Sequence, residues 1–191
     1  MIVGDPARFA IESAITRAYQ RLSFRALGYF RIHVGGKAYG RCEPEATLLA
    51  CSFDTVGRRL ADRGDHTAPF SGESDAGKIA DAFLNVIYAD RQDASYFGLS
   101  SVEFAAYFSG SSNNLKWAPD GDEAFDDGSF VLQFDVGNRV RLIAFRYGSD
   151  HHHDAATLSD MWILEEMFYD TLLEWHGAFQ NEWRTSPKCT E

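Results

Sequence analysis

Three consecutive histidines and an aspartate, at residues 151–154, are the side chains of this sequence best suited to binding a metal ion. Imidazole nitrogens bind Zn²⁺, Ni²⁺ or Cu²⁺, and in an extended chain His151 and His153 point to the same side. A catalytic metal usually needs three converging ligands with ordered supporting contacts, and neighbouring loop residues converge poorly. No HExxH or comparable spacing accompanies these histidines. We therefore expect a solvated loop without a metal, and a small metal-dependent enzyme is the alternative.

An acidic run between residues 120 and 127 is the second group that could carry chemistry. A calcium-binding EF-hand loop needs oxygen ligands at alternate positions followed by a glycine, but this run has Ala124 at the third ligand position and lacks the glycine. The pattern is typical either of a solvated loop or of a docking surface for a basic partner. Its carboxylates are Asp120, Asp122, Glu123, Asp126 and Asp127.

Three further carboxylates, Glu166, Asp170 and Glu174, recur every four residues near the C-terminal end. Residues at i and i+4 are neighbours on a helix, so these three would form one row. Like charges at this spacing repel by roughly 0.2–0.5 kcal/mol per pair. A solvated helix face tolerates that repulsion, and a cationic partner would relieve it. The row is therefore a second candidate surface for a basic protein.

Nucleophilic and phosphate-binding motifs are absent from the sequence. There is no G-x-S-x-G motif and no glycine-rich phosphate loop. Cys42 and Cys51 have no spacing to His33 or His66 that suggests a catalytic pair, and the three cysteines, without CxxC spacing, fit a reducing cytosol. We therefore predict no catalytic residues, no cofactor and no enzymatic activity.

Hydrophobic periodicity predicts the elements that position these side chains, with alternation indicating strands and three- or four-residue spacing indicating helices. The predicted strands cover residues 9–16, 27–34, 37–41, 47–53, 129–135, 139–147 and 158–163, the last at a sheet edge. The predicted helices cover residues 54–63, 75–89, 101–108 and 164–183. Short turns at 35–36 and 136–138 join neighbouring strands as hairpins. Hairpins outnumber βαβ units, so we expect an α+β fold with a few helices packed on a mostly antiparallel sheet.

Length and charge limit the possible partners. The 191 residues fit a single domain, 1–191, and 45% apolar residues can form its core. Of the net charge of −10, residues 71–191 contribute the acidic part, with 8 Lys/Arg against 21 Asp/Glu. Such a surface repels nucleic acid and anionic membrane and attracts a basic protein. With neither a secretory signal nor a spanning segment in the sequence, we expect a cytoplasmic protein.

The two ends of the sequence resemble the bacterial immunity protein 42 family. Residues 1–12, MIVGDPARFAIE, resemble the start of that family, and VRLIAF at 140–145 followed by FYDTLLEW at 168–175 resembles its C-terminal end. Residues 45–125 resemble no family that we recognise. The resemblance implies a cytoplasmic antidote, encoded beside a polymorphic toxin, that binds the toxin domain and blocks it without catalysis.

The family supplies no signature of binding residues. The two acidic groups described above are therefore the residues that we predict to contact a toxin domain with a basic surface. A regulatory module that binds another protein is the further alternative.

Overall fold

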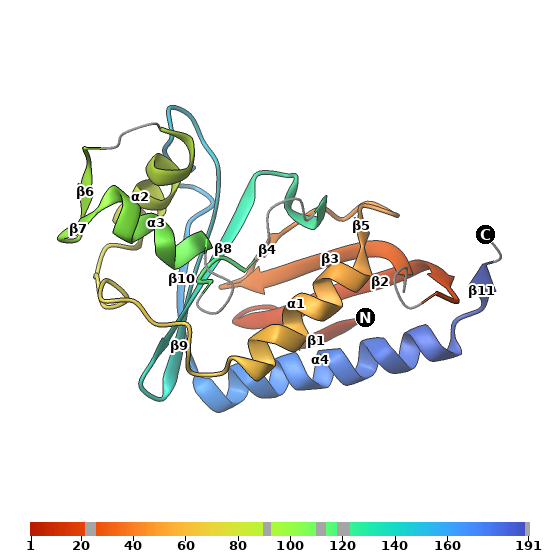
Figure 1. Cartoon of the computed structure of the whole chain (residues 1–191). Helices are drawn as coiled ribbons and strands as arrows, with labels where there is room; N and C mark the ends of the chain where they lie inside the picture. The colour runs from red at the N-terminus through yellow and green to blue at the C-terminus, as the bar shows by residue number, and fades with distance from the viewer. Residues whose placement is uncertain (22–25, 90–92, 110–113, 118–122, 190–191) are drawn as a thin grey trace.

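In the described part of the chain, the computed structural model has two main sheets, each with helices packed on it, and a third sheet of two short strands (Figure 1). The structure describes residues 1–21, 26–89, 93–109, 114–117 and 123–189. The predicted α+β class is confirmed, since the strands pair almost entirely in antiparallel fashion and helices pack on them.

The larger sheet comes mainly from the N-terminal part of the chain. Its strands are β1 (Ile2–Asp5), β2 (Phe9–Tyr19), β3 (Ala26–Val34), β4 (Lys37–Tyr39), β5 (Thr47–Leu48) and β11 (Lys188–Cys189). β1 to β4 lie in sequence order as antiparallel neighbours, β5 also pairs with β3, and β11 runs parallel to β2. Gly35 and Gly36, with φ of 60° and 81°, form the predicted turn between β3 and β4. β1 was not predicted, because its four residues carry no clear alternation.

Helices α1 (Leu49–Ala61) and α4 (Glu165–Thr185) pack against each other and against β3 and β2 respectively (Figure 1). The predicted strand at 47–53 is wrong beyond Leu48, and the predicted helix at 54–63 begins five residues earlier than expected. Leu49, Phe53 and Val56 are all buried at helical spacing, so the apolar run belongs to a helix face. A short apolar run alone cannot distinguish a buried strand from a helix.

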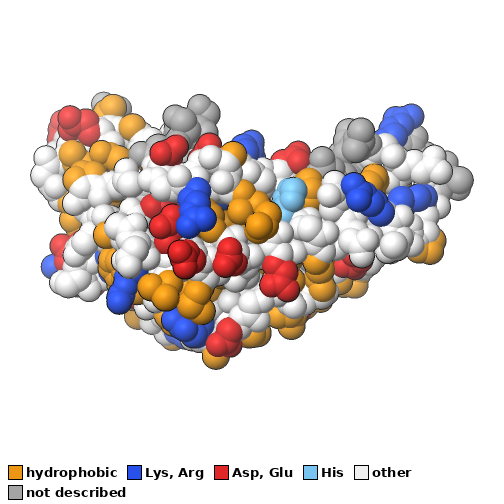
Figure 2. All heavy atoms as spheres, turned by 90° about the horizontal axis from the view of Figure 1, so that it is seen from below, with side chains coloured by type: hydrophobic (Ala, Val, Ile, Leu, Met, Phe, Trp, Pro, Cys, Tyr) orange, Lys and Arg blue, Asp and Glu red, His pale blue; other side chains and the backbone are white. Residues whose placement is uncertain are grey.

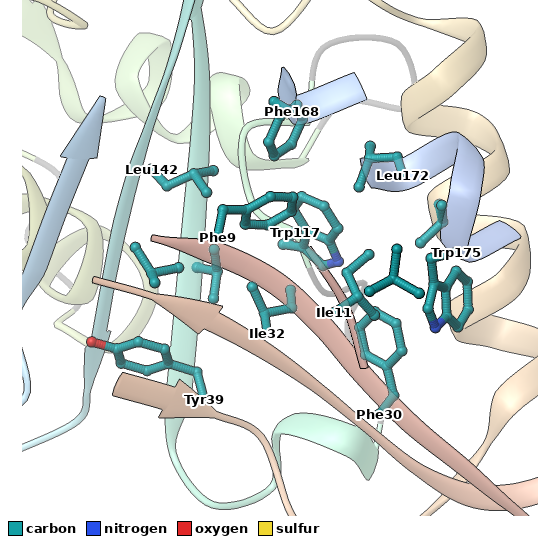
Figure 3. Close-up of a cluster of buried hydrophobic side chains, with 14 of the residues drawn as sticks. Phe9, Ile11, Phe30, Ile32, Tyr39, Trp117, Leu142, Phe168, Leu172 and Trp175 are labelled. Carbon is teal, nitrogen blue, oxygen red and sulfur yellow. The ribbon is translucent and has the colours of Figure 1, made fainter. Parts of the chain in front are cut away.

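The apolar stripe of α4 forms much of the first hydrophobic core, as predicted. Phe168, Leu172 and Trp175 are fully buried against residues of β2 and β3 (Figure 3). The Trp175 ring meets Phe30 edge-on at a centroid distance of 5.2 Å, and its indole N–H donates to Ser13 Oγ at 3.0 Å. This anchoring leaves the opposite face of α4 open to solvent.

The second sheet has the order β10–β9–β8 and carries its own helices. Its strands are β8 (Ser129–Val136), β9 (Arg139–Arg146) and β10 (Ser159–Leu164). The predicted hairpin at 136–138 and the predicted edge strand are both confirmed, although Leu164 ends the strand instead of starting the last helix. The remaining elements are α2 (Ala76–Tyr88), β6 (Ser95–Tyr96), β7 (Leu99–Ser100), α3 (Ser101–Ser109) and the 3-10 turn η1 (Glu123–Phe125).

Both helices beside this sheet begin as the sequence predicts. Asp75 caps α2 by accepting from the backbone N–H of Gly77 and Lys78. Ser100 and Glu103 form a capping box at the start of α3, the helix predicted over 101–108, with the Ser100 hydroxyl 2.7 Å from the Glu103 carboxylate.

The β8–β9 hairpin forms a wall shared by two hydrophobic cores. Along β9, Leu142 and Ala144 face the first core, whereas Ile143 and Phe145 face the second, where α2 and α3 pack. A strand buried on both faces reads as a continuous apolar run, which explains the sequence Leu-Ile-Ala-Phe at 142–145.

Candidate functional site

The acidic row on α4 exists as predicted and faces solvent. Glu166, Asp170 and Glu174 are all exposed, and within the described part of the chain none of the three forms a salt bridge. Met167 and Leu173, which are 47% and 62% exposed, flank the row. Figure 2, which views the molecule from the α4 side, shows acidic side chains with hydrophobic ones between them. The face combines exposed negative charge with accessible apolar surface.

The acidic run lies only partly within the described residues. Asp120 and Asp122 fall outside them. Glu123 and Asp126 are exposed, whereas Asp127 is partly buried and lies 3.3 Å from Arg146 Nη2. Asp127 also accepts the backbone N–H of Ser129 at 3.1 Å, so it helps to fix the turn into β8.

The two acidic groups lie on different sides of the molecule. η1 contacts β3 and β5 near one edge of the larger sheet, whereas α4 packs along β1 and β2 near the other (Figure 1). The acidic turn at 126–128 instead adjoins the end of β9, where Tyr147 N–H donates to Gly128 O at 2.8 Å. The described members of the two predicted acidic groups therefore form two separate surfaces.

The histidine loop is largely exposed, as expected from the sequence, but two of its histidines are tied to α2. His153 Nδ1 lies 2.6 Å from Asp81 Oδ1, and its side chain is only 12% exposed. His152 Nδ1 lies 3.0 Å from the other oxygen of Asp81. The two imidazoles therefore converge on one carboxylate of α2 and fasten the loop to that helix. Among the described residues, no group of three His, Cys, Asp or Glu side chains could hold a metal ion.

A cluster of surface rings beside this loop was missed in the sequence. Tyr88, at the end of α2, meets Tyr147 edge-on at a centroid distance of 5.5 Å and stacks on His151 at 6.4 Å. The Tyr147 hydroxyl lies 3.4 Å from His151 Nδ1. Tyr88 and Tyr147 are nevertheless 50% and 38% exposed. These residues, Tyr88, Tyr147 and His151, are called the ring patch below; an exposed tyrosine at the end of the amphipathic helix was the only sequence signal for it.

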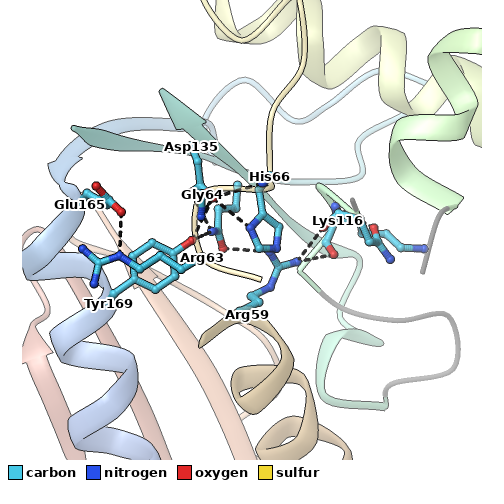
Figure 4. Close-up of polar contacts among 10 residues, drawn as sticks. Arg59, Arg63, Gly64, His66, Lys116, Asp135, Glu165 and Tyr169 are labelled. Carbon is cyan, nitrogen blue, oxygen red and sulfur yellow. Dashed lines mark hydrogen bonds and ion pairs between the residues drawn. The ribbon is translucent and has the colours of Figure 1, made fainter. Parts of the chain in front are cut away.

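A buried polar cluster joins the two cores at the opposite end of β8 (Figure 4). The Asp135 carboxylate accepts the hydroxyl of Tyr169 at 2.9 Å, the amide of Gln133 at 3.1 Å and the backbone N–H of Gly64 at 2.9 Å. His66 Nδ1 lies 3.1 Å from the same carboxylate. All four side chains are at least 90% buried, so the cluster connects elements instead of facing a ligand.

Hydrogen bonding and burial set the charge states in this cluster. Burial by itself raises the pKa of Asp135, but the hydrogen bonds from His66, Gln133 and Tyr169 outweigh it and hold the pKa below its ordinary value. Burial and the neighbouring Asp135 raise the pKa of Tyr169. Burial lowers the pKa of Arg59 to about 9, which leaves it protonated at neutral pH, and its guanidinium donates to Gln133 Oε1 at 2.8 Å.

Comparison with known proteins identifies the family. A family model described as immunity protein 42 matches residues 1–178. The chain belongs to the immunity protein 42 family. The match extends through residues 45–125, where we recognised no resemblance, and confirms the resemblance seen at the two ends.

This family member shares its fold with a solved structure described as CdiI from Burkholderia dolosa AUO158. The TM-score is 0.58 at 14% identity, and the alignment covers 93% of this chain and 99% of that one. At this identity the likeness concerns the fold alone. A comparison with curated proteins finds no match. In the described part of the chain, no helix combines the length and the apolarity that crossing a membrane requires.

Proposed function

We propose that this immunity protein 42 family member binds a cognate bacterial toxin domain in the cytoplasm and neutralises it by covering its surface, without catalysing a reaction. The observation that carries the proposal is the family match over residues 1–178. The absence of a nucleophile or phosphate-binding motif in the sequence supports a binding mechanism.

The toxin surface that meets this protein is proposed to be basic. The net charge of −10 and the exposed carboxylates on α4 and around η1 favour association with a cationic protein over nucleic acid or anionic membrane. Many toxin domains act on nucleic acid and carry basic active sites, which carboxylates can occupy in place of phosphate. The proposed contact residues are Asp120, Asp122, Glu123, Asp126, Asp127, Glu166, Asp170 and Glu174.

A single interface of ordinary size would use only one of the two acidic surfaces. Specific interfaces bury about 800 Å² on each partner, roughly a tenth of a small protein's surface. The row on α4 and the turn at 126–128 lie on different sides of the molecule, so one compact toxin domain would contact only one of them. The other would attract the toxin electrostatically from a distance.

Co-expression with the toxin domain encoded immediately upstream tests the proposal. Cells that produce the wild-type chain should survive, and the purified proteins should associate at a rate that falls steeply as salt is raised, while dissociation changes less. Two charge-neutral variants separate the surfaces: Glu123→Gln with Asp126→Asn, and Glu166→Gln with Asp170→Asn and Glu174→Gln. Absence of binding by the wild-type chain would refute the function. Binding insensitive to salt and to both variants would refute its electrostatic part.

A further inference from the structure

The ring patch presents two exposed tyrosines that contact each other and a histidine. Tyrosine is enriched among residues that dominate binding energy, because a large amphipathic ring contributes contact area with few rotatable bonds. Here two tyrosines and a histidine hold one another in edge-on and stacked contacts while the tyrosines remain 38–50% exposed. The rings are therefore ordered before any partner arrives.

The loop that carries His151 is held by a dense set of contacts. Gly148 N–H donates to His152 O, His152 N–H donates to Ser149 O and Asp154 N–H donates to Arg146 O, each at 2.9 Å. Asp81 then accepts the backbone N–H of His153 at 3.0 Å in addition to its contacts with both imidazoles. These bonds fix the loop in position on α2.

The same loop turns sharply through two residues with positive φ. Asp150 and His151 have φ of 53° and 63°, the left-handed region, which aspartate and histidine adopt more readily than most residues other than glycine. The His153 ring lies over Gly77, where an added Cβ would come within 3.0 Å of its Cε1 atom. The glycine in α2 therefore makes room for the histidine, and the contacts with α2 sustain the turn that brings the His151 ring to Tyr88.

The surroundings of the ring patch favour a cation. Asp150 is exposed and precedes His151. The turn at 126–128, which carries the exposed Asp126 and an Asp127 paired with Arg146, is hydrogen-bonded to Tyr147 through Gly128 O. A guanidinium or ammonium group is attracted both to the faces of aromatic rings and to nearby carboxylates. Arginine fits best, because its planar group stacks on rings and pairs with carboxylates at once.

We propose that the ring patch is the anchor of the toxin interface and receives an arginine or lysine side chain of the toxin domain. The inference rests on the proposed function and selects the end of β9, with its acidic turn, as the contact surface. The row on α4 then acts only through its longer-range field.

Dissociation of the complex with the upstream-encoded toxin domain tests the anchor. Tyr88→Ala with Tyr147→Ala should raise the dissociation rate by about 30-fold or more, as expected for loss of dominant interface residues. Leu173→Ala, which truncates an even more exposed apolar residue on α4, is the control and should change the dissociation rate by less than about threefold. Far-ultraviolet circular dichroism and the thermal midpoint verify that all variants fold.

Two replacements of the same tyrosines distinguish a cation from an apolar side chain. Phenylalanine at both positions keeps the ring faces and should retain binding within about threefold, whereas leucine keeps apolar area without ring faces and should lose about tenfold or more. Equal binding by the leucine variant would contradict the cationic occupant.

The remaining outcomes are also decisive. If wild-type protein binds the toxin and the double alanine variant dissociates no faster, the anchor lies elsewhere and the inference fails while the proposed function stands. If the free protein self-associates through the patch, and the alanine variant is monomeric but still binds toxin as tightly, the patch contacts a second copy and the inference is refuted. If wild-type protein does not bind, the proposed function itself fails.

Discussion

The two histidine–carboxylate sites near opposite ends of the β8–β9 hairpin use the same chemistry in different surroundings. Asp135 and His66 are 6% and 5% exposed at the junction of the two cores, whereas Asp81 is 30% exposed and His152 is 62% exposed beside the ring patch. A buried carboxylate that loses a partner leaves an uncompensated polar group, and a surface one exchanges its partner for water. We therefore expect the buried contact between Asp135 and His66 to stabilise the fold. The exposed contact between Asp81 and His152 should instead hold a surface loop in position.

Asp135→Asn should have the largest effect on stability. Removing one partner of a buried ionic network costs roughly 3–5 kcal/mol. For a chain of this size that corresponds to a fall in the unfolding midpoint of roughly 6–20 °C, measurable by calorimetry. Asp126→Asn, the same change on an exposed side chain, is the control and should stay within about 0.5 kcal/mol. Similar midpoints for the two variants would remove the distinction by burial.

The pH dependence of unfolding should carry the signature of Asp135. Its pKa in the folded protein is lowered, so its stabilising contribution is complete above the unfolded-state pKa, about 3.9, and is lost as the pH falls through the folded value. The stability of the wild-type protein should thus fall below about pH 4 more steeply than that of Asp135→Asn, in urea titrations from pH 7 to 2. If the unfolding free energies of the wild-type protein and Asp135→Asn fell in parallel from pH 7 to 2, the pKa of Asp135 would not be lowered in the folded protein.

Asp81→Asn should have little effect on stability and a larger effect on toxin binding, the reverse of Asp135→Asn. Because Asp81 is partly exposed, its loss should cost about 1 kcal/mol of unfolding free energy or less. The loop that presents His151 is held less firmly on α2 when the Asp81 carboxylate is lost, so toxin dissociation should accelerate about tenfold in surface plasmon resonance. Gly77→Ala, which crowds the His153 ring, should act in the same direction. A large loss of stability with unchanged dissociation would reverse the comparison.

Neutralising the α4 row should have the smallest effect. Glu166→Gln, Asp170→Asn and Glu174→Gln together remove two like-charge pairs, so stability should rise by roughly 0.4–1 kcal/mol. Toxin association should slow by less than about threefold at physiological salt, because the Debye length is only about 8 Å. A larger slowing, accompanied by faster dissociation, would place the interface on α4.

Locally encoded elements of this fold could be predicted from the sequence. The α4 stripe, the Asp75 cap of α2, the Ser100–Glu103 box and the Gly35-Gly36 turn each depend on residues a few positions apart. The apolar run at 47–53 was misassigned because only its packing against β3 and α4 decides between strand and helix.

The candidate site was predictable only in part, because its contacts join distant segments. The acidic row follows from four-residue spacing within one helix. In contrast, Asp81 and His153 are separated by 72 positions, and the ring patch brings the end of α2 to a loop after β9. No periodicity encodes such pairings, and a positive φ at His151 leaves no mark on composition. The histidine loop therefore appeared solvated in the sequence although it is fastened to a helix.

The most direct test of neutralisation by binding is a titration of the upstream-encoded toxin domain's activity with this purified protein. A protein that works by covering the toxin should abolish activity at one molar equivalent, with partial inhibition in proportion below that ratio. Active toxin should be recovered, unchanged in mass, when the complex is denatured and the toxin refolded. Complete inhibition at a small fraction of an equivalent, or a covalently altered toxin, would show that the protein acts as an enzyme and would contradict the proposed function.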